Sequence, residues 1–173
     1  MKKLYLDYLQ LYVSRADRDL AVFRSFVDGW HGYKSGPPFL RKTGRLRWFN
    51  NPDPVHAQSL RNSNVAISRN AESALDQGQP TKFVVDHAVP LKIIRNELLK
   101  ITSVTPSKIE AALERLYRLV LVTKDENSLL NKRYSSSMPE NWDGRNCYAR
   151  YEAAGIEIVA VSNAPLAAPE NPG

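Results

Sequence analysis

The stretch KFVVDHAVP, residues 82–90, decides how this chain folds. Its first half is a β-branched and aromatic run of strand length, and the run ends in Asp86 and His87. Pro90 is expected to be the first residue of a helix that continues through LKIIRNELLKI, residues 91–101, in which large apolar side chains recur at helical spacing. The stretch therefore predicts a strand that carries an acid and a histidine at its end and leads into a helix.

The residues that follow predict a second helix, a second strand and a third helix. Thr105 and Pro106 have the form of an N-cap followed by proline, and an apolar stripe at helical spacing comes after them. The run LVLVT, residues 119–123, is typical of a buried strand. The polar segment KDENSLLNKRY, residues 124–134, predicts a short and mostly exposed helix with Asn127 in its first turn.

The amino-terminal residues predict helical structure. Residues 1–30 carry apolar side chains at the three-four spacing of one helical face, which indicates one long helix or two. Ser14 and Asp17 have the form of a capping box, so the second case predicts a new helix over residues 15–28. Glycine and proline residues within 32–38 then end the helical pattern.

Shorter elements are predicted elsewhere. They are a short strand at 46–49, a weakly patterned helix at 56–75, a helical turn at 147–154 and a strand at 156–162. We expect the Pro- and Ala-rich residues 164–173 to form a disordered tail.

The composition is that of a globular protein with one core. The 173 residues are 43% hydrophobic and 24% charged, and we predict a single domain over residues 1–163. The single cysteine, Cys147, excludes an internal disulfide and a cysteine-based zinc or iron–sulfur site, and we expect it to be a small buried hydrophobe. Asp7 interrupts an amino terminus that begins like a signal peptide, so we expect a soluble, cytoplasmic protein with no membrane partner.

The net charge of +6 is concentrated in residues 31–70, which hold seven Lys or Arg and one Asp. A basic stretch interleaved with aromatic residues is typical of a polyanion-binding surface, and a solvated basic loop is the alternative interpretation. The seven basic residues are Lys34, Arg41, Lys42, Arg45, Arg47, Arg61 and Arg69. We predict that the first five of them, together with Lys124, contact DNA.

The pair of Asp86 and His87 suits the hydrolysis of a phosphodiester. A neutral imidazole can take a proton from water near neutral pH, and the oxygens of Asp86 and Asn127 are the hard ligands that Mg²⁺ or Mn²⁺ prefers. Two adjacent residues at a strand end point to opposite faces, so one can bind a cation while the other reaches water. Taken singly, the Asp-His pair is more typical of a structural hydrogen bond, and Asn127 of a helix cap.

Together the segments KFVVDHAVP and LVLVTKDEN resemble the two halves of an HNH, or ββα-metal, endonuclease motif. The resemblance implies that Asp86 and Asn127 bind the metal and that His87 is the general base. It also implies a branch of the family without structural zinc, because Thr123 and Glu126 stand where many relatives have zinc-binding cysteines.

One position departs from the family pattern. The middle Asn of the family corresponds here to Arg118, which we predict either to act as a catalytic residue on the scissile phosphate or to face solvent. Asn131, one helical turn after Asn127, is the rival metal ligand. His31 and His56 are expected to be surface or structural residues.

These inferences predict an α+β fold. A ββα-metal unit at 82–134 lies between a helical, basic region at 1–80 and a carboxyl-terminal strand region at 135–163. The resemblance implies a DNA endonuclease that uses Mg²⁺ or Mn²⁺, acts on double-stranded DNA as a possible homodimer, and has a restriction, phage or mobile-element role. Two alternatives stay open: a non-specific or RNA-directed nuclease of the toxin type, and a nucleic-acid-binding protein without turnover.

Overall fold

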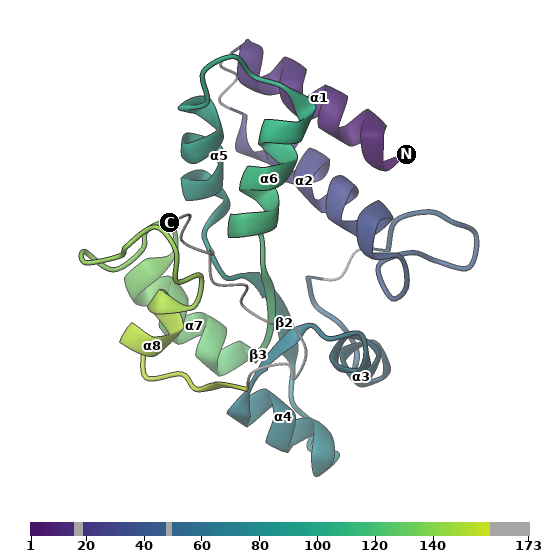
Figure 1. The fold of residues 1–173 in the computed structure, drawn as a ribbon. Helices are drawn as coiled ribbons and strands as arrows, with labels where there is room; N and C mark the ends of the chain where they lie inside the picture. Colours follow the sequence, from purple (N-terminus) through teal and green to yellow (C-terminus); the bar gives the residue numbers. More distant parts are fainter. Residues whose placement is uncertain (16–18, 48–49, 160–173) are drawn as a thin grey trace, which may run out of the picture.

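The computed structural model describes residues 1–15, 19–47 and 50–159. Within these residues the chain forms eight helices and a four-stranded mixed sheet, an α+β arrangement (Figure 1). The elements are α1 (Lys2–Ser14), α2 (Leu20–Ser35), α3 (Pro54–Asn62), β1 (Ala66–Ser68), α4 (Arg69–Asp76), β2 (Phe83–His87), α5 (Leu91–Leu99), α6 (Pro106–Leu116), β3 (Leu119–Thr123), α7 (Lys124–Tyr134), α8 (Ala149–Ala153) and β4 (Ile158–Val159). None of the described helices has the length and apolar character that a membrane crossing requires.

The sheet has the strand order β2-β3-β1-β4, which makes β2 and β4 its edges. β2 and β3 are antiparallel, with Phe83 opposite Thr123 and His87 opposite Leu119. β1 pairs in parallel with β3 and antiparallel with β4. Every residue of β3 is buried, which explains why its sequence is a continuous apolar run and not an alternating one.

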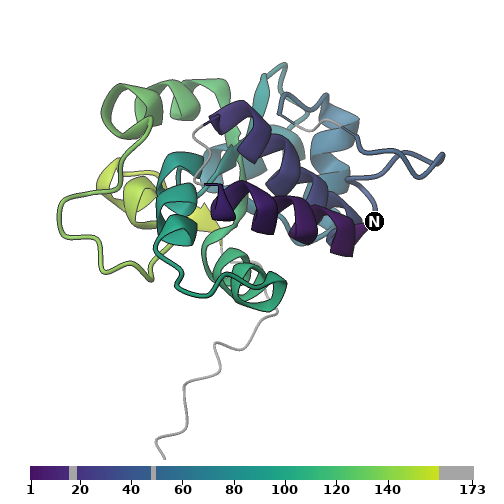
Figure 2. The same ribbon diagram turned by 90° about the horizontal axis from the view of Figure 1, so that it is seen from above.

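The helices gather in two groups around this sheet. α1, α2, α5 and α6 contact one another, and α1 and α2 lie side by side (Figures 1 and 2). α7 packs on β2 and β3 and contacts α8, whereas α3 and α4 contact β3. The chain therefore has the order of an antiparallel strand pair followed directly by a helix that packs on both strands, with α5 and α6 inserted between the strands.

Several local signals are confirmed by these elements. The strands at 83–87 and 119–123 and the helices of residues 91–99, 106–116 and 124–134 appear where they are predicted. The Thr105 side chain accepts a hydrogen bond from the backbone N–H of Lys108 at 3.3 Å, as its N-cap role requires. Pro90 differs from the prediction by one position, since it is the N-cap of α5 and not its first residue.

The second helix begins later and ends later than predicted. It starts at Leu20, because the Asp19 carboxylate accepts hydrogen bonds from two backbone N–H groups of the first turn. It continues to Ser35, so the predicted range 15–28 is wrong at both ends. Asp17, which belongs to the predicted capping box, lies outside the described residues.

α2 ends at Ser35 with Gly36 as its C-cap at a φ of 69°, so the glycine and proline residues within 32–38 end the helical pattern as predicted. Gly29 and Gly32 lie inside the helix at points of close packing. A β-carbon built on Gly29 would lie 2.3 Å from the ring of Tyr5, and one built on Gly32 would lie 2.4 Å from the side chain of Leu46. These glycines allow close approach of neighbouring segments, and the helix tolerates them because the packing compensates for their lower helix propensity.

The predicted helix at 56–75 is wrong, because the chain forms α3 and α4 with the strand β1 between them. β1 has only three residues, and all of them are buried, so it shows no alternation that the sequence could reveal. Tertiary pairing with β3 therefore outweighs the weak helical pattern.

Two predicted strands are only partly described. In the first, at 46–49, Leu46 forms an isolated bridge with Leu40, and residues 48–49 lie outside the described part of the chain. In the second, at 156–162, the strand covers Ile158–Val159, and the residues from 160 onward, including the predicted tail, lie outside it as well.

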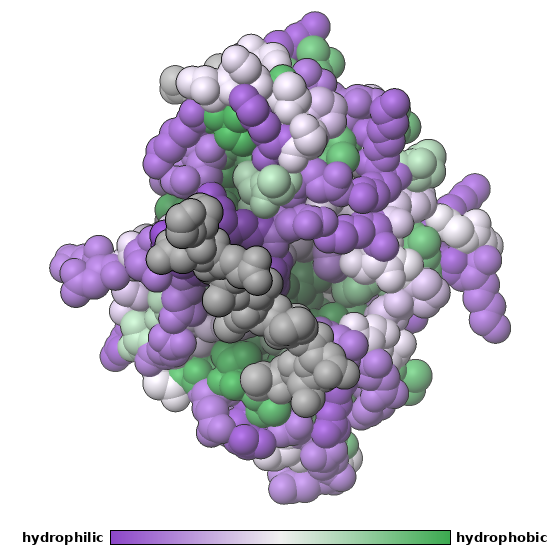
Figure 3. All heavy atoms as spheres, viewed as in Figure 1, coloured by the Kyte–Doolittle hydropathy of each residue, from purple (hydrophilic) through white to green (hydrophobic). Residues whose placement is uncertain are grey.

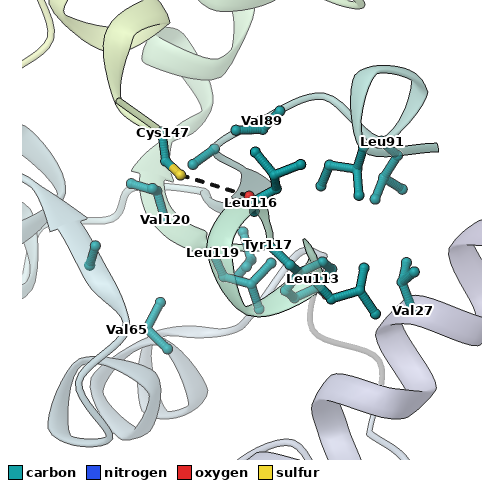
Figure 4. Close-up of a cluster of buried hydrophobic side chains, with 14 of the residues drawn as sticks. Val27, Val65, Val89, Leu91, Leu113, Leu116, Tyr117, Leu119, Val120 and Cys147 are labelled. Atoms are coloured by element: carbon teal, nitrogen blue, oxygen red, sulfur yellow. Dashed lines mark hydrogen bonds between the residues drawn. The ribbon is translucent and has the colours of Figure 1, made fainter. Parts of the chain in front are cut away.

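The buried apolar side chains form one cluster that connects both groups of helices to the sheet. Figure 4 shows Leu113, Leu116 and Tyr117 at the end of α6 between Val27 on α2 and the start of β3. Cys147 is buried, its thiol points toward the carbonyl of Leu116, and burial raises the pKa of the thiol. The prediction of a buried cysteine is confirmed.

Glu126 joins α7 to the middle of the sheet through a buried hydrogen-bond network. Its Oε2 accepts hydrogen bonds from the Ser68 hydroxyl at 2.6 Å and from the Thr123 backbone N–H at 2.9 Å. Its Oε1 accepts one from Asn70 at 3.0 Å, and the Thr123 hydroxyl completes a capping box. Glu126 stands where the resemblance places a zinc-binding cysteine of many relatives, and in this chain it is the second member of the capping box of α7.

We expect Glu126→Ala to lower the free energy of unfolding by about 1–3 kcal/mol, because it leaves buried donors on Ser68 and Thr123 without an acceptor. Urea denaturation followed by circular dichroism measures this change, with Glu140→Ala, an exposed carboxylate, as the control. Equal midpoints for the two variants would contradict a structural role of the network.

Candidate active site

The side chains of β2 alternate between two faces of the sheet. Val85 and His87 are buried, and Val84 and Asp86 are half-buried on the other face. Asp86 and His87 are neighbours in the sequence that meet different surroundings, as the pleat predicts.

His87 contacts an acid from outside the motif-bearing segment. Its Nε2 lies 2.9 Å from Oδ1 of Asp28 on α2, and the Tyr117 hydroxyl donates a hydrogen bond to the same oxygen at 2.7 Å. Nε of Arg24 lies 3.4 Å from Oδ2 of Asp28. The side chains of His87 and Asp28 are only 9% and 4% exposed. The interior thus holds a hydrogen-bonded cluster of one carboxylate and three donors.

The charges in this cluster support one another. Burial opposes the negative charge of Asp28, but the hydrogen bond and charge of His87, the Tyr117 hydroxyl and the Arg24 guanidinium favour it, so the pKa of Asp28 lies below its usual value. Burial and the Asp28 charge raise the pKa of Tyr117 well above its usual value. Asp28 is therefore the ionised acceptor, and Tyr117 remains a donor.

The other two histidines have structural surroundings. His31 lies between the rings of Phe39 and Tyr117, with centroid separations of 4.7 and 4.9 Å, and burial lowers its pKa to about 4. His56 is buried at the start of α3, and burial lowers its pKa too. Both rings are neutral packing groups near neutral pH, in agreement with a structural role.

Asp86 is held by two side chains of α8. Its Oδ2 forms an ion pair with Nη2 of Arg150 and accepts a hydrogen bond from the Tyr151 hydroxyl. Burial and the negative charge of Asp86 raise the pKa of Tyr151 well above its usual value, so the hydroxyl stays protonated. Oδ1 of Asp86 has no hydrogen bond to a side chain or backbone group of the described residues.

Arg150 fixes the end of β2 against the carboxyl-terminal part of the chain. Its guanidinium donates hydrogen bonds to the carbonyls of Ala88 at 2.9 Å, His87 at 2.6 Å and Tyr134 at 3.1 Å, in addition to the ion pair with Asp86. The side chain is only 3% exposed. A planar group with several fixed donors suits this position, and a lysine would not reproduce it.

Asn127 lines a pocket of about 570 Å³ that lies between the loop before α3, the start of β2 and the first turns of α7. The lining residues are Asn51, Pro52, Asp53, Pro54, Thr81, Lys82, Phe83, Val84, Lys124, Asn127 and Ser128. Asn127 is half-buried, and its amide has no hydrogen bond to the described part of the chain. Lys82 and Lys124 form no ion pair with a described residue, so the pocket has a positive wall.

Asp86 and Asn127 lie on one face of the sheet without touching. Val84 lines the pocket together with Asn127, and it precedes Asp86 by one side-chain position on the same face, a step of about 7 Å. Both side chains carry oxygens with free lone pairs, and oxygen is the ligand type that Mg²⁺ and Mn²⁺ prefer. The ion pair with Arg150 already compensates the charge of Asp86, and residues 1–15, 19–47 and 50–159 hold no group of three or more acidic, histidine or cysteine side chains suited to a metal.

The basic residues divide into paired and unpaired groups. Lys34 pairs with Glu114 at 2.7 Å, and Arg47 lies 3.9 Å from Asp53. Arg61 and Arg69 also pair with acidic side chains. Arg41, Lys42 and Arg45 are exposed on the loop after α2 and form no ion pair with a described residue. Hydrophilic side chains project where this loop leaves the body of the molecule (Figure 3).

Arg118 and Asn131 form no hydrogen bond or ion pair with His87 or Asp86. The Arg118 guanidinium donates hydrogen bonds to the carbonyls of Glu114 and Tyr117 at the end of α6, and the residue is exposed. Asn131 is exposed on α7. Arg118 has no acceptor, so it cannot take the place of an asparagine oxygen beside His87.

Asp28, Tyr117, Arg150 and Tyr151 are the residues of the site that the sequence does not reveal as such. Asp28 is 59 positions from His87, and Arg150 is 64 positions from Asp86. The sequence signal that could have indicated Asp28 is a charged residue on the otherwise apolar face of a predicted helix, next to Val27.

The low pKa of Asp28 makes stability depend on acid pH. Its folded-state pKa lies below the usual 3.8, so its stabilising contribution is complete above that pH and is lost as the pH falls through the folded-state value. We expect Asp28→Asn to flatten the acid side of the stability curve, measured by urea denaturation at several pH values. Glu140→Gln is the control, and a variant curve parallel to that of the wild type would contradict the assignment.

The arrangement of β2, β3 and α7 is the part of the site that corresponds to the resemblance. The two strands are antiparallel, Asp86 and His87 end the first of them, and Asn127 stands in the first turn of the helix that follows the second. Comparison with family models, with curated proteins and with solved structures found no match to this chain.

Proposed function

We propose that this protein is a divalent-metal-dependent endonuclease of the HNH type that hydrolyses phosphodiester bonds in DNA. The observation that carries the proposal is the position of Asp86 and His87 at the end of a strand that pairs antiparallel with β3 and is covered by α7. This order puts Asp86 and His87, whose Nδ1 has no hydrogen bond to a described residue, at the end of β2, and puts Asn127 on the helix that covers the strand pair.

His87 is the base in this proposal. Nε2 forms a hydrogen bond with the carboxylate of Asp28, whereas Nδ1 has no hydrogen bond to the described residues. Nδ1 is therefore the nitrogen that can take a proton from water. Asp28 balances the positive charge that the ring then acquires. As a general base, His87 would remove a proton from the water molecule that attacks the substrate phosphorus.

The metal would be held by Asp86 through Oδ1 and by Asn127 through its amide oxygen, the donors that the described residues leave free. When bound, Mg²⁺ or Mn²⁺ supplies positive charge to the leaving oxygen of the phosphodiester. Arg150 and Tyr151 orient the Asp86 carboxylate by holding Oδ2.

The DNA backbone would meet two sets of unpaired cations. The first is the exposed loop with Arg41, Lys42 and Arg45, and the second is the pair of Lys82 and Lys124 at the pocket of Asn127. Unpaired side chains can release counterions from phosphates without first breaking an ion pair. The charge count of residues 31–70 predicts a DNA-binding surface, and the separation of these cations from the ion-paired ones narrows that surface to the unpaired side chains.

A second candidate function is nucleic-acid binding without turnover. The observation that favours it is the ion pair of Asp86 with the buried Arg150, which leaves less negative charge for a cation. The two functions share the same basic surface, so only a measurement of cleavage separates them.

We expect the purified protein to nick supercoiled plasmid in Mg²⁺ or Mn²⁺ and not in a chelator. His87→Ala is expected to lower the nicking rate at least about 100-fold, because a positioned base contributes that much or more. The control is His56→Gln, which changes a histidine of α3 outside the Asp28 cluster.

Unchanged nicking by His87→Ala would remove His87 as the base. Binding of plasmid without nicking in any of these metals would replace the nuclease by the second candidate. A labelled RNA of the same sequence serves as a parallel substrate, and faster cleavage of RNA than DNA would favour the RNA-directed alternative.

The unpaired cations of the loop predict a salt effect on binding. We expect the double variant Arg41→Ala with Arg45→Ala to make the slope of log affinity against log salt concentration shallower by about 1.8, since each phosphate contact contributes about 0.9. Fluorescence anisotropy with a duplex in chelator measures it. The double variant Arg61→Ala with Arg69→Ala changes the same charge at paired positions, and an equal effect of the two would contradict the division.

A further inference from the structure

The hydrogen bond between His87 and Asp28 decides which nitrogen of His87 carries the proton. A carboxylate only accepts hydrogen bonds, so Nε2, 2.9 Å from Asp28 Oδ1, must be the donor. In the neutral ring the proton then sits on Nε2, and Nδ1 keeps a lone pair. Nε2 therefore donates a hydrogen bond to the buried carboxylate, and Nδ1 is a hydrogen-bond acceptor.

Asp28 is itself held in place from two sides. The Tyr117 hydroxyl, from the turn between α6 and β3, donates to the same Oδ1 at 2.7 Å, and Arg24, one turn before Asp28 on α2, approaches Oδ2 at 3.4 Å. The ring of Tyr117 also packs edge-on against the ring of His87, with centroids 5.2 Å apart. The cluster fixes both the position of the carboxylate and the plane of the imidazole.

The residue at the position of the family's middle Asn cannot accept a hydrogen bond from His87. Arg118 stands at the position of the middle Asn, its guanidinium has no acceptor, and it donates hydrogen bonds to the carbonyls of Glu114 and Tyr117. The acceptor comes instead from α2, an element outside residues 82–134.

We propose that Asp28 is the positioning residue for His87: its carboxylate fixes the imidazole in the Nε2–H tautomer and leaves Nδ1 as the atom that takes the proton of water. In this step the O–H bond of water breaks, the new N–H bond forms at Nδ1, and the resulting hydroxide is the nucleophile. The use of Nδ1 as a base rests on the proposed nuclease function, whereas the tautomer is a property of the free protein.

The first test reads the tautomer directly. In protein labelled with ¹⁵N-histidine, long-range ¹H–¹⁵N spectra of the neutral ring distinguish a protonated from an unprotonated Nδ1. We expect wild-type His87 to show the Nε2–H form alone, and Asp28→Asn to show the Nδ1–H form as well, since an amide can donate to Nε2. The Nδ1–H form in the wild type, or an unchanged spectrum in Asp28→Asn, would overturn the proposal.

The second test reads the consequence for turnover. We expect Asp28→Asn to lower kcat for plasmid nicking at least about 100-fold with KM for DNA within about 2-fold, the signature of a misoriented base. Glu140→Gln, the same change of acid to amide at an exposed position, should leave both constants unchanged. A kcat of Asp28→Asn within about 2-fold of the wild type would show that Asp28 is only structural.

The two tests separate the inference from the proposed function. If the wild-type protein shows the Nε2–H tautomer and Asp28→Asn changes it, but no plasmid is nicked, then Asp28 orients His87 and the nuclease proposal fails. If Asp28→Asn does not fold, Asp28→Ser takes its place in both tests: its shorter hydroxyl does not reach Nε2, so the ring loses its acceptor and is expected to show both tautomers and the same loss of kcat.

Discussion

The antiparallel pairing of β2 with β3 is the constraint on which the rest of the structure depends. It places His87 opposite Leu119, directly after the turn that carries Tyr117, and it places the start of α7 beside the start of β2. The hydrogen bonds of this ladder fix backbone positions to within a residue, because a slip by one would exchange Asp86 and His87 between the two faces. The buried cluster of Asp28 and the ion pair of Arg150 can form only in this register.

Local patterns in the sequence are sufficient to predict the elements that make up this pairing. The run of residues 119–123 and the cap at Thr105 are strong because they depend on neighbouring residues only, and both are found in the structure. β1 could not be predicted, since a strand of three buried residues has no period. The length of α2 could not be predicted either, because the side chains that pack against Gly29 and Gly32 come from other segments of the chain.

The candidate site shows the same division between local and distant information. The pattern of Asp86, His87 and Asn127 draws attention to β2 and α7, but the side-chain hydrogen-bond partners of Asp86 and His87 lie 59 or more positions away. No periodicity links such positions, and only the folded chain does. Charge counting has a related limit, since it finds seven basic residues in 31–70 but not the acidic partners that neutralise Lys34, Arg61 and Arg69.

The chain leaves the sheet after His87 and returns at Leu119, and the backbone N–H of Ala88 donates a hydrogen bond to the carbonyl of Arg118 at 2.8 Å. The segment 88–118, which contains α5 and α6, is thus an insertion between two paired strands, and a backbone hydrogen bond joins its two ends. Its far end is the turn around Ser103 between the two helices, where changes of length are expected to affect α1, α5 and α6 before the strands at its base. The surface formed by this insertion can therefore change in sequence and length while the backbone at the end of β2 keeps its position.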